Sequence, residues 1–194
     1  MRCVTTATAV AIAATLSNPL PAAAQDKPGY EYRLLATSMT HTMELELNRA
    51  AEDGFRFRTA MGGETNGGNE VVIIMARRSG DRPRVAYRLL ATSRTSTMEK
   101  ELQAAADQGF EYRAQTTFKS AFNGDEVVCI LERDANAPAR QSRYRLLATT
   151  KTSTLEKELN QVGAAGYEIL GMTVGKTAFG GKELVAILRR VEER

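Results

Sequence analysis

The six residues Tyr-Arg-Leu-Leu-Ala-Thr occur three times in this chain, and this repetition constrains the fold more than any other feature. The copies begin at Tyr32, Tyr87 and Tyr144, which are 55 and 57 residues apart. A glycine followed by an aromatic residue recurs with the same spacing. Because this period is longer than that of common solenoid units, each copy is predicted to be a small domain.

The predicted repeats span residues 30–77, 85–134 and 142–192. The segments between them read SGDRPR and ANAPARQS, and their Gly, Pro and Ser residues are typical of linkers. The sequence therefore predicts three tandem units of similar length.

Each copy carries the same order of secondary-structure signals. The hexapeptide predicts a strand, and the next segment predicts a helix because Met98, Leu102 and Ala105 recur at helical spacing. Ser96 with Glu99, and Ser153 with Glu156, predict a capping box at the helix start. A glycine then predicts the helix end, and two strands joined by a Gly-containing turn complete a β-α-β-β unit.

The last strand of each copy is apolar on both faces. In the first copy, Val71, Ile73 and Met75 alternate with Val72, Ile74 and Ala76. Such a strand must be covered on both sides of its sheet, and one helix covers only one side. Each buried aliphatic side chain contributes roughly 1.5–3 kcal/mol, so leaving the second face exposed is costly.

We therefore predict an α+β fold of three tandem β-α-β-β repeats, each a three-stranded sheet with one helix on one face. The bare sheet faces of different copies are expected to pack together. Because the number of copies is odd, one face remains for a partner, which is either an unidentified protein or a second copy of the chain.

The third copy reads LEKELNQVGAAGYEIL over 155–170. It resembles a small bacterial β-α-β-β family of unknown function whose members read Leu-Glu-x-x-Leu-Asn-x-x-Gly-x-x-Gly-Trp-Glu. Tyr167 stands at the position of the family's Trp, and Gly163 is Ala51 and Ala106 in the other copies. The resemblance implies the same fold and brings no catalytic residues with it.

The first 24 residues are typical of a cleaved secretory signal. Arg2 is followed by a short apolar run and then by Ala22, Ala23 and Ala24, which resemble a cleavage site. The run is too short to cross about 30 Å of hydrocarbon, and no transmembrane segment is predicted. We expect cleavage near Ala24 and export to the periplasm or the outside of the cell.

Charge and cysteine content exclude further classes of function. The chain has 26 Lys and Arg against 23 Asp and Glu, and this small excess has no aromatic platform beside it, so nucleic-acid binding is not predicted. The two cysteines are Cys3, in the predicted signal, and Cys129, so no intramolecular disulfide is expected. Cys129 lies in an apolar strand and is predicted to be an inert packing residue.

Several motifs that suggest chemistry have simpler structural interpretations. His41, the only histidine, stands where Ser96 and Ser153 stand in the other copies and is predicted to be a degenerate helix cap. One histidine and one cysteine leave little for a soft-metal site, so no metal or cofactor is predicted. The stretch GMTVGKT at 171–177 has too few residues between its glycines for a phosphate-binding loop, and we interpret it as a hairpin turn.

Paired acids recur on each helix, as in Glu99 and Glu101. Residues two apart on a helix diverge by about 200°, so the pair cannot share a proton or a metal ion. Glu99 is instead expected to serve the helix cap, and acids in the first turn suit the helix dipole.

The Thr- and Ser-rich loops that precede the helices are the strongest candidates for a binding site in this sequence. Helix N-termini of this kind often bind anions, although capping is the competing interpretation. The candidate residues for a polar ligand are Thr92, Ser93, Arg94, Ser96, Thr149, Thr150, Lys151 and Ser153.

No nucleophile with a positioned base is evident, so the chain is not predicted to be an enzyme. The leading hypothesis is an exported, non-enzymatic protein-binding or scaffold module of the cell envelope. The alternative is a periplasmic small-molecule or anion-binding protein that uses the Thr/Ser loops.

Overall fold

The computed structural model describes residues 29–92, 95–120, 124–138, 141–176 and 181–192. The predicted signal peptide therefore lies outside the described residues. Within the described part of the chain, no helix has the length and apolar character needed to cross a membrane.

Each repeat contains one helix and three strands in the predicted order. The first repeat consists of β1 (Tyr30–Thr37), α1 (Thr40–Glu52), β2 (Arg56–Thr65) and β3 (Gly68–Arg78). The second consists of β4 (Val85–Thr92), α2 (Thr95–Ala106), β5 (Glu111–Ser120) and β6 (Gly124–Asp134). The third consists of β7 (Ser142–Thr149), α3 (Thr152–Gly163), β8 (Glu168–Lys176) and β9 (Lys182–Val191).

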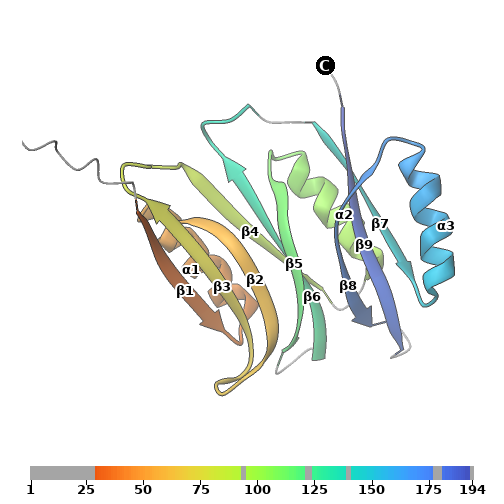
Figure 1. Cartoon of the computed structure of the whole chain (residues 1–194), viewed down its shortest axis with the longest axis horizontal. Coiled ribbons are helices and arrows are strands. Elements are labelled where there is room, and N and C mark those ends of the chain that lie inside the picture. The colour runs from red at the N-terminus through yellow and green to blue at the C-terminus, as the bar shows by residue number, and fades with distance from the viewer. Residues whose placement is uncertain (1–28, 93–94, 121–123, 139–140, 177–180, 193–194) are drawn as a thin grey trace, which may run out of the picture.

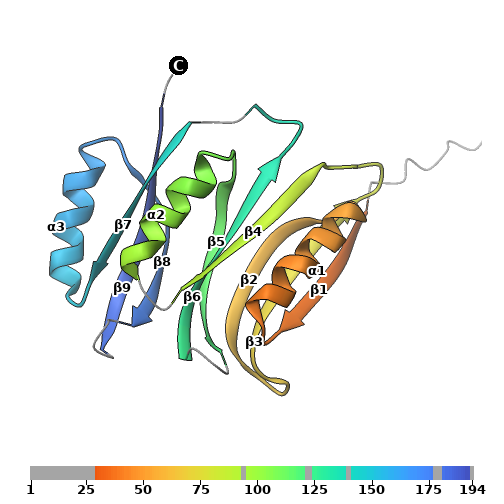
Figure 2. The same cartoon turned by 180° about the vertical axis from the view of Figure 1, so that it is seen from behind.

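The strands of each repeat form an antiparallel sheet whose last strand is central, in the orders β1-β3-β2, β4-β6-β5 and β7-β9-β8. The register is the same each time, since the hexapeptide tyrosine pairs with Ala76, Glu132 or Arg189. Figure 1 shows the three sheets standing side by side in chain order, and Figure 2 shows α1 lying across one face of its own sheet. The same helix also contacts β4.

The glycine that ends each helix behaves as predicted. Gly54, Gly109 and Gly166 have φ values of 86°, 83° and 84°, a region that favours glycine. After α2, the Phe110 N–H donates to the carbonyl of Ala105 and turns the chain into β5.

The predicted helix starts are wrong in the first and third repeats. The N-cap residues of α1 and α3 are Met39 and Lys151, and neither forms a side-chain cap bond. His41 and Ser153 lie inside the first turn, and the hydroxyls of Thr37 and Thr149 accept the N–H of Met39 and Lys151 instead. A threonine two residues earlier thus turns the chain, which starts the helix sooner than the capping box indicates.

The predicted cover for the two-faced strands is present in the second and third repeats. In the first core, Met43 and Leu47 of α1 pack with Ile73 of their own sheet and with Val128 and Ile130 of the next sheet. The second core repeats this arrangement, with Tyr144 and Ile187 coming from the third repeat. The α+β repeat fold is confirmed. The bare sheet faces of the second and third repeats pack against the helix-bearing side of the preceding repeat, and not against another bare face.

Cys129 lies in the second core. Its side chain is fully buried, and its Sγ lies 3.7 Å from the Sδ of Met98. Burial raises the pKa of the thiol to about 12, so it is protonated at neutral pH and packs as an apolar group.

We expect Cys129 in the folded protein to resist a thiol reagent at pH 8, because both its burial and its pKa disfavour the reactive thiolate. Peptide mapping by mass spectrometry should find Cys129 labelled only after unfolding in denaturant. Labelling of native Cys129 as fast as that of an unfolded control would contradict this packing.

Candidate functional site

The boundary between successive repeats is held by an amide side chain that binds the edge of the next sheet. Asn48 of α1 accepts the N–H of Tyr87 at 2.9 Å through Oδ1 and donates to the Tyr87 carbonyl at 3.0 Å through Nδ2. In the next repeat, Gln103 of α2 accepts the Tyr144 N–H at 3.1 Å and donates to the Ser142 carbonyl at 3.1 Å. Each amide therefore satisfies the open edge of an edge strand, as a neighbouring strand would.

A carboxylate one helical turn earlier binds the same strand. Glu44 Oε2 accepts the Leu89 N–H at 2.8 Å, and Glu99 Oε2 accepts the Leu146 N–H at 2.9 Å. Because donor bonds to an ionised acceptor are among the strong hydrogen bonds, this contact fixes the register of the next repeat. Glu99 thus binds the neighbouring repeat, and its predicted capping role stays a prediction because the side chain of Ser96 lies outside the described residues.

The hexapeptide tyrosine completes the contact from the other side. The hydroxyls of Tyr87 and Tyr144 accept the N–H of Phe57 at 2.7 Å and of Tyr112 at 2.9 Å. These N–H groups lie at β-bulges in β2 and β5, where the ladder leaves backbone groups unpaired. Burial raises the pKa of Tyr87 and of Tyr144, so both hydroxyls remain protonated.

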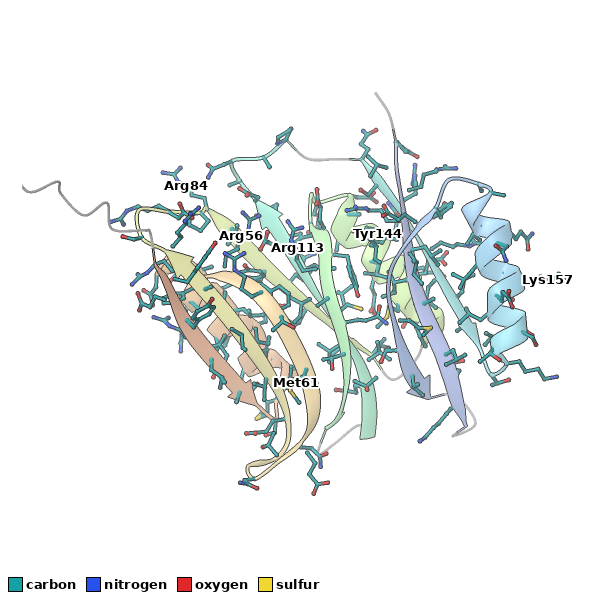
Figure 3. All side chains as sticks on the ribbon, in the orientation of Figure 1. Arg56, Met61, Arg84, Arg113, Tyr144 and Lys157 are labelled. Carbon is teal, nitrogen blue, oxygen red and sulfur yellow. The ribbon has the colours of Figure 1, made fainter. Side chains whose placement is uncertain are left out.

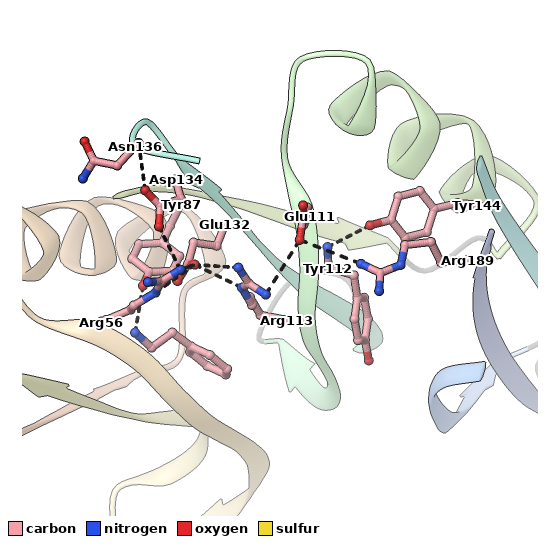
Figure 4. A network of polar contacts seen from close by, with 11 residues as sticks. Arg56, Tyr87, Glu111, Tyr112, Arg113, Glu132, Asp134, Asn136, Tyr144 and Arg189 are labelled. Atoms are coloured by element: carbon pink, nitrogen blue, oxygen red, sulfur yellow. Dashed lines mark hydrogen bonds and ion pairs between the residues drawn. The ribbon is translucent and has the colours of Figure 1, made fainter. Parts of the chain in front are cut away.

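Glu132 is a buried carboxylate, only 1% exposed, at the centre of the first boundary (Figure 4). It accepts hydrogen bonds from Arg56 at 2.6 Å, Arg113 at 2.8 Å and the Tyr87 hydroxyl at 2.7 Å. Burial by itself raises the pKa of Glu132, but the hydrogen bonds from Arg56 and Tyr87 and the charges of Arg113 and Arg56 outweigh it and lower the pKa. The carboxylate is thus charged and fully paired.

The second boundary has the same pair of positions with the charges exchanged. Glu111 stands where Arg56 stands in the first repeat, and Arg189 stands where Glu132 stands, opposite the hexapeptide tyrosine. Arg189 lies 3.8 Å from Glu111, which is also 3.9 Å from Arg113. A continuous salt-bridge network therefore links all three repeats (Figure 4).

A polar cleft of about 660 Å³ lies beside this network. Its lining carries both signs of charge and includes Arg56, Arg82, Arg113, Glu132 and Asp134. Within the described residues, no three His, Cys, Asp or Glu side chains lie close enough to bind a metal ion together. Arg56, Arg113, Glu132 and Asp134 are engaged with one another, and these contacts fix one repeat against the next.

The predicted ligand loops lie apart from this network. Thr92 and Thr149 end β4 and β7, whose ends point to the lower edge of Figure 1, whereas Arg56 and Arg113 of the network lie in the upper half of Figure 3. Thr92 lies 3.5 Å from Thr97, Thr149 binds the Lys151 N–H, and Thr150 and Ser153 are exposed.

Ser93 and Arg94 lie outside the described residues, as does the side chain of Ser96. Ligand binding by these loops stays a prediction, and the structure assigns each loop to its own repeat. The stretch from Gly171 to Lys176 belongs to strand β8 and pairs with β9, so its interpretation as a hairpin turn is wrong over those residues, and Thr177 lies outside the described residues.

Sequence reasoning missed the amide side chains at the boundaries. The sequence pattern that could have revealed them is a glutamate followed four residues later by Asn or Gln, because this spacing places both side chains on one helix face. The pattern recurs in all three helices, at Glu44/Asn48, Glu99/Gln103 and Glu156/Asn160.

Comparison of the chain with protein-family models, curated proteins and solved structures finds no match. The resemblance of the third repeat to a β-α-β-β family stays a prediction.

Replacing Asn48 by Ala should lower the free energy of unfolding by about 1–3 kcal/mol, because it leaves two backbone groups of β4 without partners. The matched control is Asn160→Ala, at the same position of the last repeat, where the change should be within about 0.5 kcal/mol. Urea denaturation at low protein concentration measures both. Equal effects of the two substitutions would contradict the role of Asn48.

Glu132→Gln should destabilise the protein by about 3 kcal/mol at pH 7, because it removes the charge that two arginines surround. The pKa of Glu132 is lowered in the folded state, so its stabilisation is present above about pH 4.3 and is lost as pH falls through the folded pKa. The stability gap between wild type and variant should narrow in acid. A gap independent of pH would contradict the assignment, and Glu52→Gln, at an exposed carboxylate, serves as the control.

Proposed function

We propose that this chain is an exported, non-enzymatic scaffold of the cell envelope that binds protein through the two ends of its repeat array. The signal-like first 24 residues support export. The buried carboxylate and tyrosine hydroxyls support a structural role for the interior, since they bind one another and the backbone.

One comparison carries the proposal. Tyr87 and Tyr144 are 3% and 4% exposed, whereas the equivalent residue in the first repeat, Tyr32, is 66% exposed. Tyr32 belongs to the first sheet's outer face, which the second and third repeats bury against a neighbour. Leu34 and Met61 on that face are also exposed. An apolar surface of this kind in a folded domain marks an interaction site.

The other end of the array presents a complementary surface. A groove of about 430 Å³ lies between α3 and the third sheet, lined by Thr152, Leu155, Glu156, Leu159, Asn160, Met172 and Leu184. The equivalent surface of each earlier repeat is filled by the next repeat. Ile169, Met172 and Val174 of β8 are exposed beside it.

The salt-bridge network suits a scaffold, because it holds the two end surfaces at a fixed separation and orientation. Small-molecule or anion binding at the Thr/Ser loops remains the alternative. The two hypotheses differ in which substitution abolishes binding.

The immobilised protein should retain a defined protein from an envelope extract, and Leu34→Glu should abolish retention because it puts a charge in the apolar face. Leu45→Glu is the matched control, because Leu45 is an exposed leucine on α1, away from both ends. Two results together would favour ligand binding by the Thr/Ser loops: retention of the partner protein that Leu34→Glu does not change, and a thermal shift caused by phosphate or a small molecule.

A further inference from the structure

We propose that the partner of each end is the other end of a second copy, so that chains add head to tail. The head is the outer face of the first sheet, with Tyr32, Leu34, Met61, Val72 and Ile74. The tail is the groove between α3 and β8 described above. This inference rests on the proposed protein-binding role of the ends and names the partner.

The tail keeps the side chains that bind an edge strand at the inner boundaries. Glu156 and Asn160 stand where Glu44 and Asn48 stand in α1, and both are exposed. The Asn160 amide donates to the Glu156 carbonyl at 3.0 Å, as the Asn48 amide donates to the Glu44 carbonyl at 2.9 Å. The side chain is therefore already in the orientation that binds a strand in the first repeat.

The head keeps the strand that these side chains bind. β1 is an edge strand with the same hexapeptide as β4 and β7. By equivalence, Asn160 would bind the backbone N–H and carbonyl of Tyr32, and Glu156 would accept the N–H of Leu34. The Tyr32 hydroxyl would accept the N–H of Ile169, which stands at the β8 bulge as Phe57 stands at the β2 bulge.

The apolar surfaces also correspond. At the first inner boundary, Val128 and Ile130 enter the core beside Leu47 and Ala60. The equivalent head residues are Val72 and Ile74, and the equivalent tail residues are Leu159 and Met172, which line an open groove. The tail thus lacks the side chains that the head supplies.

Charge favours this pairing over a head-to-head one. At the first boundary, Arg56 lies 3.2 Å from Asp134. The equivalent positions at the ends are Glu168 on the tail and Arg78 on the head, which are oppositely charged and both exposed. A contact between two heads would leave Arg78 without Glu168 as its partner. Because head and tail differ, the contact is heterologous and produces rings or filaments.

The first test is sedimentation velocity on the protein purified from the periplasm of an expression host. Wild type should form assemblies that grow with concentration. Leu34→Glu, which blocks the head, and Met172→Glu, which blocks the tail, should each be monomeric, while Leu45→Glu should assemble like wild type. The side chains of Leu34, Leu45 and Met172 are all exposed, so none of the three substitutions should unfold the monomer.

Mixing the two blocked variants separates head-to-tail addition from other association. Each variant keeps one intact end, so the mixture should form a one-to-one dimer and nothing larger. Absence of this dimer would overturn the proposal. So would a wild-type protein that stays monomeric at every soluble concentration, or a Met172→Glu variant that assembles like wild type.

A charge exchange tests the register. Arg78→Glu and Glu168→Arg should each weaken assembly by about tenfold, and the double variant should regain it because every junction then has an exchanged pair. Additive loss in the double variant would overturn the assigned register. If purified chains do not associate but an envelope protein is retained through Leu34, the proposed function stands and this inference fails.

Discussion

The structure depends on the need to cover a central strand that is apolar on both faces. In β6, Val127, Cys129 and Leu131 face α2, while Val128 and Ile130 face the first repeat. A single β-α-β-β unit supplies one helix and therefore cannot bury both sets. Tandem repetition solves this problem, because each unit is completed by the one before it. The order of the chain is thus also the order of packing.

The helices serve two sheets at once, and this explains their composition. One side of α1 buries Met43 and Leu47 in its own repeat, and Glu44 and Asn48 bind the edge of the next. These polar groups satisfy an edge strand that no other strand pairs with, which protects it from non-native pairing. Apolar burial supplies the affinity between repeats, and the polar contacts determine their register.

Much of the fold could be predicted from the sequence, because the strands, the helices and the helix ends depend on residues close to one another in the chain. Continuous apolar runs predict β3, β6 and β9, the helical spacing of apolar residues predicts α2, and Gly54, Gly109 and Gly166 end their helices through their own backbone freedom. The helix starts were misplaced because Thr37 and Thr149 act from outside the expected cap position. The roles of Asn48 and Glu132 depend on which strands lie side by side across a boundary, and no local pattern carries that information.

The exchange of charges between the two boundaries has a consequence for how such an array can evolve. Arg56 meets Glu132 at the first boundary, and Glu111 meets Arg189 at the second. Deleting the middle unit would set Arg56 against Arg189, two guanidinium groups in a confined space, with no carboxylate between them. The units are alike in fold yet are not interchangeable in position. A few ionic pairs therefore depend on the order of the repeats. Losing or reordering a copy would break these pairs, even though the repeats share one fold.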